Sequence, residues 1–540
     1  MSTHDQERVL PNQRRVVVIG GGLSGITAAI ALKRDLNFHN FTIYDRADAL
    51  GGTWKYNVYP GCRSDVATHF YSLSTDLNPD WEESHVLQPQ LLAYWQGLAD
   101  KYHLSSHVQP NSDVTEVAWD DEHQLYHLTI RDVRSGEVRT DEAHVVVSAL
   151  GALDVLSYPP ELDGVVKTFK GKQFHSARWD DSVELHGKRV AVVGNGCSAT
   201  QLIPYIVKDP STHVVSFCRQ PKWIAPAANF KYSNFSRWLF RNVPFWTRLY
   251  RWILYFQLEM IYFYVMGGGQ NSMLRRIGEQ TLRNYMKSKT PESLHSQIIP
   301  TIPLGCQRII LDYGYLESLR ARNHELNFDG IAEVTETGFI TKKGETFDFD
   351  VIIMATGFVV DKYPLNVKGI NGKSLQDYHA EHGGPSAYRG ISTPGFPNFY
   401  MFAGPNTATG HGSACYMTEV NTDYIMQMIK PVVDGNVASF RPSDRATDAW
   451  NESLQKRLST SVWAYCSSWY RVDHDKKILV VWPGTLTEYW WRLREPIWND
   501  FKVVDGERWE RTRRGAGMEL VLKICAVLMG AASMLLWRAS

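Results

Sequence analysis

Two groups of glycines in this chain have the spacing that binds a dinucleotide, and each is followed by a charged residue. In the first group, Gly20, Gly22 and Gly25 fill the pattern G-x-G-x-x-G. This pattern provides a tight turn, a close approach of backbone to a pyrophosphate, and close packing of a helix on a strand. The next apolar stretch ends in Asp45, whose carboxylate would accept hydrogen bonds from a ribose diol.

The second group is followed by a cation instead of an acid. Arg219 ends the strand after this turn, with Gln220 next to it and Lys222 close behind. A guanidinium at this position pairs well with a ribose 2′-phosphate, which favours NADPH over NADH. The alternative is that Arg219 is only a solvated charge at the end of a strand. The residues of the turn expected to contact this cofactor are Gly194, Asn195, Gly196, Cys197, Ser198, Ala199 and Thr200.

The segments around the two turns predict the elements that position them. Apolar runs at 16–19 and 190–193 are typical of buried strands, and a helix is expected after each turn. Two dinucleotide sites in one chain, one acidic and one basic, suggest FAD that exchanges electrons with NADPH. Two further strands, within 143–153 and 348–358, are expected where such folds return to the flavin. We therefore predict an α/β fold with two Rossmann-like dinucleotide-binding domains, in which the FAD-binding domain is discontinuous and the NADP-binding domain is inserted.

The predicted boundaries follow from these patterns. They are 1–150 and 346–440 for the FAD-binding domain, 151–225 and 300–345 for the NADP-binding domain, 226–299 for an aromatic-rich helical insertion, and 441–515 for a C-terminal segment packed on both domains.

Composition excludes several classes of protein. The 540 residues carry no formal net charge, which gives no electrostatic reason to expect a nucleic-acid partner. The seven cysteines are scattered, with no C-x-x-C pair and no metal-ligand spacing, so we expect reduced thiols, an intracellular protein and no metal. Cys62 is alone near the first turn, which excludes a disulfide reductase.

At 169–180, "FKGKQFHSARWD", the chain resembles a known family. Phe169, Gly171, His175, Trp179 and Asp180 fit F-x-G-x-x-x-H-x-x-x-W-[P/D], the fingerprint of type I Baeyer–Villiger monooxygenases. The resemblance extends over nearly the whole chain and is greatest to fungal members that act in secondary metabolism. It implies that this segment links the two domains and that His175 is a hinge anchor rather than a proton-transfer base. An ordinary linker histidine is the alternative.

The resemblance also implies the activity and its residues. An enzyme of this family uses FAD, NADPH and O2 to insert one oxygen atom beside a ketone carbonyl, which gives an ester or lactone. Arg308 would be the catalytic arginine that stabilises an anionic oxygen adduct, and Asp65 would orient it. An ion pair at a domain interface is the alternative role for Arg308. Trp469 would cover the nicotinamide, and the expected flavin contacts are Thr53, Trp54, Lys55, Tyr56, Arg63, Ser64, Asp65, Tyr71 and Val114.

One residue departs from the family pattern. Gln307 stands where a lysine commonly helps to bind the 2′-phosphate, which leaves more of the NADPH preference to Arg219. The substrate is expected to be a small ketone, with a polyketide or terpenoid among the candidates. Two other functions remain: a flavin monooxygenase that oxidises sulfur or nitrogen or that hydroxylates, and a flavoprotein without catalytic activity.

Two apolar stretches are not explained by these motifs. Residues 230–266 are exceptionally aromatic, with Arg237, Arg241, Arg248 and Arg251 at helix-like intervals, and Pro244 should divide them into two helices. We expect this segment to wall the substrate pocket; the alternative is a basic, aromatic surface that lies on a membrane. Residues 520–537 are apolar with a single charge, so a C-terminal membrane anchor within 518–538 is expected, or a final packed helix.

Overall fold

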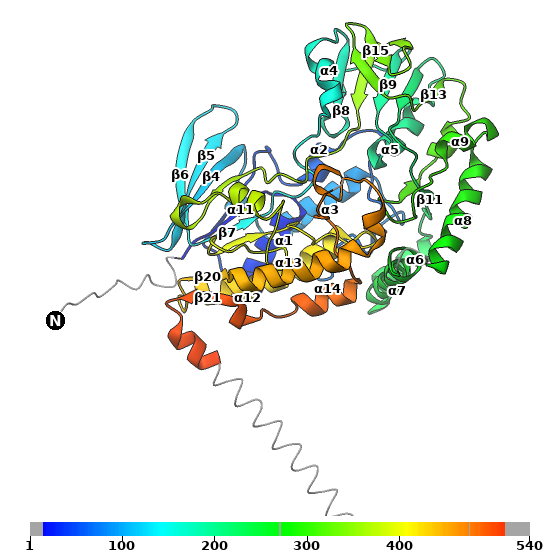
Figure 1. The fold of residues 1–540 in the computed structure, drawn as a ribbon. Coiled ribbons are helices and arrows are strands. Elements are labelled where there is room, and N and C mark those ends of the chain that lie inside the picture. Colours follow the sequence, from blue (N-terminus) through cyan, green and yellow to red (C-terminus); the bar gives the residue numbers. More distant parts are fainter. Residues whose placement is uncertain (1–13, 269–271, 475, 514–540) are drawn as a thin grey trace, which may run out of the picture.

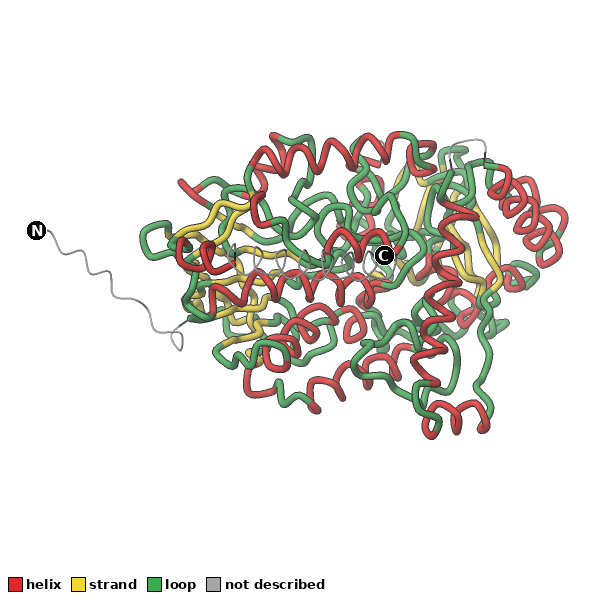
Figure 2. The backbone as a smooth tube through the Cα atoms, turned by 90° about the horizontal axis from the view of Figure 1, so that it is seen from below, coloured by secondary structure: helices red, strands yellow, loops and turns green. Residues whose placement is uncertain are grey.

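Residues 14–268, 272–474 and 476–513 are described in the computed structural model, which contains two parallel β-sheets flanked by helices (Figure 1). When the molecule is turned by 90°, the strands are seen in two groups with helices and loops between them (Figure 2). The predicted fold class, α/β with two Rossmann-like units and a helical insertion, is confirmed.

The first sheet is built around the first glycine turn. Its strands are parallel in the order β19-β7-β1-β2-β3, with both faces of the central strand buried. Val16 and Val18 face the core that contains the first helix, whereas Val17 and Ile19 face a second core. A strand buried on both faces must be apolar throughout, which explains the run "VVVI". The elements are β1 (Val16–Ile19), β2 (Phe41–Tyr44), β3 (Val108–Gln109), β7 (Val145–Ser148), β19 (Phe399–Met401), α1 (Leu23–Arg34), α3 (Gln88–Lys101) and α12 (Ala414–Val433).

The second sheet repeats this arrangement around the second glycine turn. Its parallel strands have the order β13-β10-β9-β17-β8. The elements are β8 (Lys172–His175), β9 (Arg189–Val193), β10 (His213–Phe217), β13 (His324–Asn327), β17 (Val351–Met354) and α5 (Cys197–Ile206).

The position of β17 corrects one expectation. We predicted that the strand within 348–358 returns to the FAD-binding unit, but β17 pairs with β8 and β9 of the second sheet. In the first sheet, β7 is the equivalent neighbour of β1. A buried strand of either sheet has the same apolar sequence pattern, so this pattern does not indicate to which sheet β17 belongs.

Smaller sheets and helices complete the two units. A mixed sheet with the order β18-β4-β5-β6, in which β18 is parallel to β4 and the other pairs are antiparallel, covers the second core of the first unit. The remaining strands are β4 (Ser112–Asp120), β5 (Leu125–Asp132), β6 (Val138–Ala143), β18 (Asn366–Lys368), β11 (Ile224–Pro226), β12 (Ile310–Asp312), β14 (Ile331–Val334), β15 (Gly338–Thr341), β16 (Thr346–Asp348), β20 (Ser439–Pro442) and β21 (Phe501–Val504). Short helices are α2 (Thr53–Tyr56), α4 (Asp163–Lys167), α10 (Tyr315–Ser318) and α11 (Leu375–Glu381).

The aromatic segment is helical and is divided where Pro244 predicts. The insertion lies at the right of the molecule in Figure 1, and the C-terminal helices lie along its lower edge. The elements of the whole insertion, 226–299, are α6 (Asn234–Asn242), α7 (Trp246–Ile261), the π-helix η5 (Tyr262–Met266), α8 (Met273–Lys289) and α9 (His295–Ile298). The C-terminal helices are α13 (Asp444–Ser459) and α14 (Leu486–Leu493).

The structure describes no helix with both the length and the apolar character needed to cross a bilayer. The predicted C-terminal anchor within 518–538 lies outside the described residues.

Candidate active site

Both glycine turns open onto a single cavity. Its volume is about 1340 Å³, and it is lined by Gly20 and Gly22 from the first turn, Gly194 and Gly196 from the second, and Arg308. Small-molecule sites usually measure ~300–1,000 Å³, so this cavity has room for more than one ligand. The two turns therefore serve one site.

Both turns are packed in the same way. Gly20 has φ of +106°, and a Cβ there would lie 2.5 Å from the carbonyl oxygen of Ala149, which follows β7. Gly194 has φ of +115°, and its Cβ would lie 2.4 Å from the carbonyl oxygen of Ala355, which follows β17. Only glycine fits either position. By contrast, a Cβ at Gly196 would meet nothing within 4 Å, so the backbone there faces open space that a pyrophosphate can approach.

The acid at the first turn is buried and oriented. Asp45 accepts hydrogen bonds from the backbone N–H groups of Gly21 at 2.5 Å and Ala47 at 2.7 Å. Burial raises the pKa of its carboxyl group, and these backbone N–H groups oppose that rise. Asp45 lines the cavity, and the turn itself fixes the position of its carboxylate.

One of the two cations at the second turn, Lys222, contacts Gln307, which lies outside the glycine motif. Arg219 lines the cavity, and so does Lys222, whose Nζ donates to Oε1 of Gln307 at 2.6 Å. Burial, followed by repulsion from Arg219, lowers the pKa of Lys222 to about 8. Gln307 in turn donates from Nε2 to the carbonyl oxygen of Ser467 at 2.7 Å. A lysine therefore does lie beside position 307, but it comes from another part of the chain.

Arg308 and Asp65 form the charged centre of the cavity. Nε and Nη2 of Arg308 donate to one Asp65 oxygen at 2.9 and 2.6 Å, and Nη1 donates to the carbonyl oxygen of Gly410 at 2.9 Å. The two side chains are each 25% exposed, which leaves them accessible from the cavity. Burial disfavours the guanidinium, but its attraction to Asp65 raises the pKa of Arg308 overall. The arginine is thus a permanent cation held by three contacts.

Trp469 lies on a loop that a disulfide joins to the loop of Arg308. The indole lines the cavity and is 39% exposed. Cys306, two residues before Arg308, forms a disulfide with Cys466, three residues before Trp469. The expectation that all cysteines are reduced is therefore wrong for this pair. The two cysteines are 160 residues apart in the sequence, so no local motif indicates that they pair. The other described cysteines are free.

The chain is similar to known proteins over most of its length. A family model described as NAD(P)-binding Rossmann-like domain matches residues 18–84, and one described as L-lysine 6-monooxygenase/L-ornithine 5-monooxygenase matches residues 90–242. A Baeyer–Villiger monooxygenase of Pseudomonas aeruginosa is 35% identical over 486 residues, which cover 89% of each chain. The chain belongs to the Baeyer–Villiger monooxygenase family.

Other relatives agree with this assignment. The FAD-binding monooxygenase ktnD of Aspergillus niger is 33% identical over 530 residues, or 95% of this chain and 84% of that protein. The crystal structure of OTEMO in complex with FAD and NADP has a similar fold, with a TM-score of 0.78 at 23% identity over 91% of this chain and 99% of that one. The predicted family and enzyme class, a flavin monooxygenase of the Baeyer–Villiger type, are confirmed.

The Baeyer–Villiger fingerprint forms an edge strand and the turn after it. A Cβ at Gly171 would lie 2.4 Å from the ring of Phe169 and 2.8 Å from the carbonyl oxygen of Asp350, which explains the F-x-G pair. His175 ends β8, is buried, and accepts from the N–H of Ala177 at 3.1 Å. Burial, with the charge of Arg178, lowers the pKa of His175 to about 4. This weak basicity favours an anchoring role over proton transfer.

The rest of the fingerprint faces other partners. Trp179 packs edge-on against Phe174 at 5.0 Å, and Asp180 is exposed and accepts from Ser182. Just before Trp179, the Arg178 guanidinium lies 4.0 Å above the ring of Tyr56, so the fingerprint contacts the first unit through a residue that the motif leaves unspecified.

The cavity contains most of the predicted cofactor residues. Lys55 does not line it and pairs with Asp48, and Gly25, Ala199 and Thr200 lie behind the lining. The predicted residues that do line it are Gly20, Gly22, Asp45, Thr53, Trp54, Tyr56, Arg63, Ser64, Asp65, Tyr71, Val114, Gly194, Asn195, Gly196, Cys197, Ser198, Arg219, Gln220, Gln307, Arg308 and Trp469.

The aromatic insertion lies elsewhere. None of its described residues lines this cavity, so the expectation that it walls the substrate pocket finds no support here. It lies behind the cavity wall, where Met266 packs against Gly410 and Arg251 contacts His69 and Ser72 on either side of the cavity-lining Tyr71.

Proposed function

We propose that this chain binds FAD at the first glycine turn and NADPH at the second, and inserts one oxygen atom of O2 next to a ketone carbonyl. The observation that supports it is the convergence of both turns and the Arg308–Asp65 pair on one cavity. Bound FAD would activate O2 with electrons from NADPH. Neither a disulfide reductase nor a simple binding module requires a fixed cation at this place.

The residues of the chain supply position and charge. Three of the five N–H groups of Arg308 are occupied by Asp65 and Gly410 among the described residues. The others are free to stabilise negative charge that develops on oxygen at the cavity wall. A guanidinium keeps its charge at any working pH, whereas an ammonium can lose its proton. Asp65 fixes the direction of the guanidinium, and Trp469 limits access of water.

A ketone panel tests the proposed reaction. The purified protein is given NADPH, O2 and ketones of polyketide and terpenoid type, with sulfides and amines as the alternative substrate class, and the products are analysed by mass spectrometry. An ester or lactone heavier than the ketone by one oxygen atom supports the proposal. Products formed only from sulfides or amines indicate the heteroatom-oxidising alternative, and cofactor binding without NADPH consumption indicates a non-catalytic flavoprotein.

Lys222 is expected to set the pH dependence of NADPH binding. Its lowered pKa, about 8, means that the ammonium is charged below this pH and neutral above it. The KM for NADPH should therefore rise as the pH increases through 8, while the KM for NADH, which lacks the 2′-phosphate, should not follow. Lys222→Ala should raise the KM for NADPH about tenfold at neutral pH.

Lys222→Arg is the matched control, because its charge persists at high pH. In this variant the rise in KM above pH 8 should disappear. If wild type and Lys222→Arg give the same pH profile, Lys222 is not the group that binds the 2′-phosphate.

A further inference from the structure

Helix α7 has its polar and apolar faces reversed relative to an ordinary surface helix. Its buried positions are Thr247, Arg251, Tyr255 and Glu259, which recur every four residues and include both an arginine and a glutamate. A surface helix of a soluble domain normally buries its apolar stripe and exposes its charges. The reversal requires partners for the buried charges and an environment for the exposed apolar side chains.

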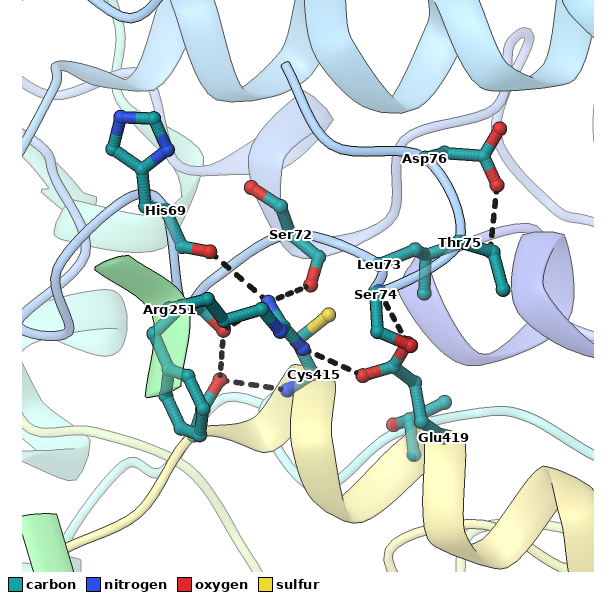
Figure 3. Close-up of polar contacts among 12 residues, drawn as sticks. His69, Ser72, Leu73, Ser74, Thr75, Asp76, Arg251, Cys415 and Glu419 are labelled. Carbon is teal, nitrogen blue, oxygen red and sulfur yellow. Dashed lines mark hydrogen bonds and ion pairs between the residues drawn. The ribbon is translucent and has the colours of Figure 1, made fainter. Parts of the chain in front are cut away.

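The buried charges have partners from the body of the protein. Arg251 donates to the carbonyl oxygens of His69 at 3.0 Å and Ser72 at 2.6 Å, and to the carboxylate of Glu419 at 2.8 Å (Figure 3). Glu259 accepts from the N–H of Leu486 at 2.5 Å, at the start of α14. These contacts fix the rotation of α7 about its axis, and this rotation determines which side chains face outward.

The outward face is apolar and aromatic. Along α7, large side chains are exposed at intervals of three or four residues, as one stripe on the side opposite Arg251. Phe256 is 60% exposed and Trp252 57% exposed. The exposed large apolar residues of α6, α7, η5 and the link between the helices are Phe235, Trp238, Phe245, Trp246, Leu249, Trp252, Ile253, Phe256, Met260, Ile261, Phe263 and Tyr264. We name this set the aromatic face.

Within residues 230–266, which carry the aromatic face, the exposed charges are positive. Residues 230–266 contain five basic residues and one acid, and the acid, Glu259, is buried. Lys231, Arg241 and Arg248 are exposed, and Arg241 pairs with Asp80. Aromatic side chains interleaved with arginines suit the headgroup region of an anionic bilayer, where the rings enter the acyl boundary and the cations meet lipid phosphates.

We propose that the aromatic face of α6 and α7 rests in the interface of a membrane that contains anionic phospholipid. The helix lies along the bilayer surface without crossing it, in keeping with the finding that no described helix is able to span. The argument rests on the reversed helix, the exposed aromatic side chains and the positive charge, and it is independent of the segment 520–537.

Vesicle sedimentation tests the proposal. Full-length wild type should co-sediment with phosphatidylcholine vesicles that contain phosphatidylserine, and less with phosphatidylcholine alone. The double variant Trp252→Glu/Phe256→Glu should bind at least about tenfold more weakly, because two large apolar side chains no longer enter the lipid. The matched control is Val138→Glu/Val166→Glu, which changes two valines exposed to 60% and 61% far from this face and should bind like wild type. Thermal melting of each variant verifies that it folds.

A labelling experiment separates this surface from any other membrane contact of the chain. An environment-sensitive dye on a cysteine introduced as Phe256→Cys should shift its emission to the blue when vesicles are added, while the same dye at Glu137→Cys, on the exposed turn between β5 and β6, should not. Equal binding of the two double variants, or no shift at position 256, overturns the proposal. A dimer without lipid that only Trp252→Glu/Phe256→Glu abolishes would also overturn it, because the face would then be covered by a second copy.

Discussion

Replacing Arg308 by alanine is expected to lower the rate of ester or lactone formation about 10²–10³-fold, the usual cost of removing one group that stabilises developing oxyanion charge. Arg308 is a cation that faces the cavity, and it is held by Asp65 at 2.6 Å and by Gly410 at 2.9 Å. The transfer of electrons from NADPH should persist, because the glycine turns are untouched. NADPH consumption and product formation are measured together, and the ratio of product to NADPH should collapse.

Two further variants show whether the position of the charge matters. Arg308→Lys keeps a cation but not the two hydrogen bonds to Asp65, and should recover only part of the activity. Asp65→Asn keeps the size of the side chain and removes the charge that orients the guanidinium. If Arg308→Ala still forms product at the wild-type rate, the arginine is only an ion pair between the two units.

Replacing Arg251 by methionine is expected to lower the free energy of unfolding by about 3–5 kcal/mol, the usual cost of breaking a buried ion pair from one side. The carboxylate of Glu419 and the carbonyl groups of His69 and Ser72 would lose their shared donor. Urea-induced unfolding, followed by tryptophan fluorescence, gives the difference.

Arg248→Met is the control for this effect, because the same change is made three residues earlier on the exposed side of α7. It should alter stability by no more than about 0.5 kcal/mol. The double variant Arg251→Met/Glu419→Gln should recover part of the loss, since no unpaired charge remains buried. Equal stability of Arg251→Met and Arg248→Met would contradict the account of α7 as a helix fixed by its buried charges.

The local parts of this molecule were predictable from sequence, and the parts set by distant contacts were not. The strands and turns around Gly20 and Gly194 follow from spacing alone, because a few neighbouring residues determine their geometry. The helix break at Pro244 is equally local. Arg308 and Asp65, however, are 243 positions apart, and only resemblance to a family suggested that they meet.

Three features escaped prediction for a common reason. β17 is apolar enough for either sheet, and only tertiary pairing assigns it to the second. Lys222 meets Gln307 across 85 positions, so no motif joins them. The spacing of arginines on α7 suggested one basic surface, but it did not indicate that Arg251 points inward. In each case the decisive contact lies outside the window that a sequence pattern covers.

The bond between Cys306 and Cys466 matters to anyone who prepares this protein. If this bond were reduced, the covalent link between the loop of Arg308 and the loop of Trp469 would be lost, and the hydrogen bond from Gln307 to Ser467 would remain between them. Protein with this bond intact and protein with it reduced are therefore chemically distinct, and rates measured on one form do not apply to the other.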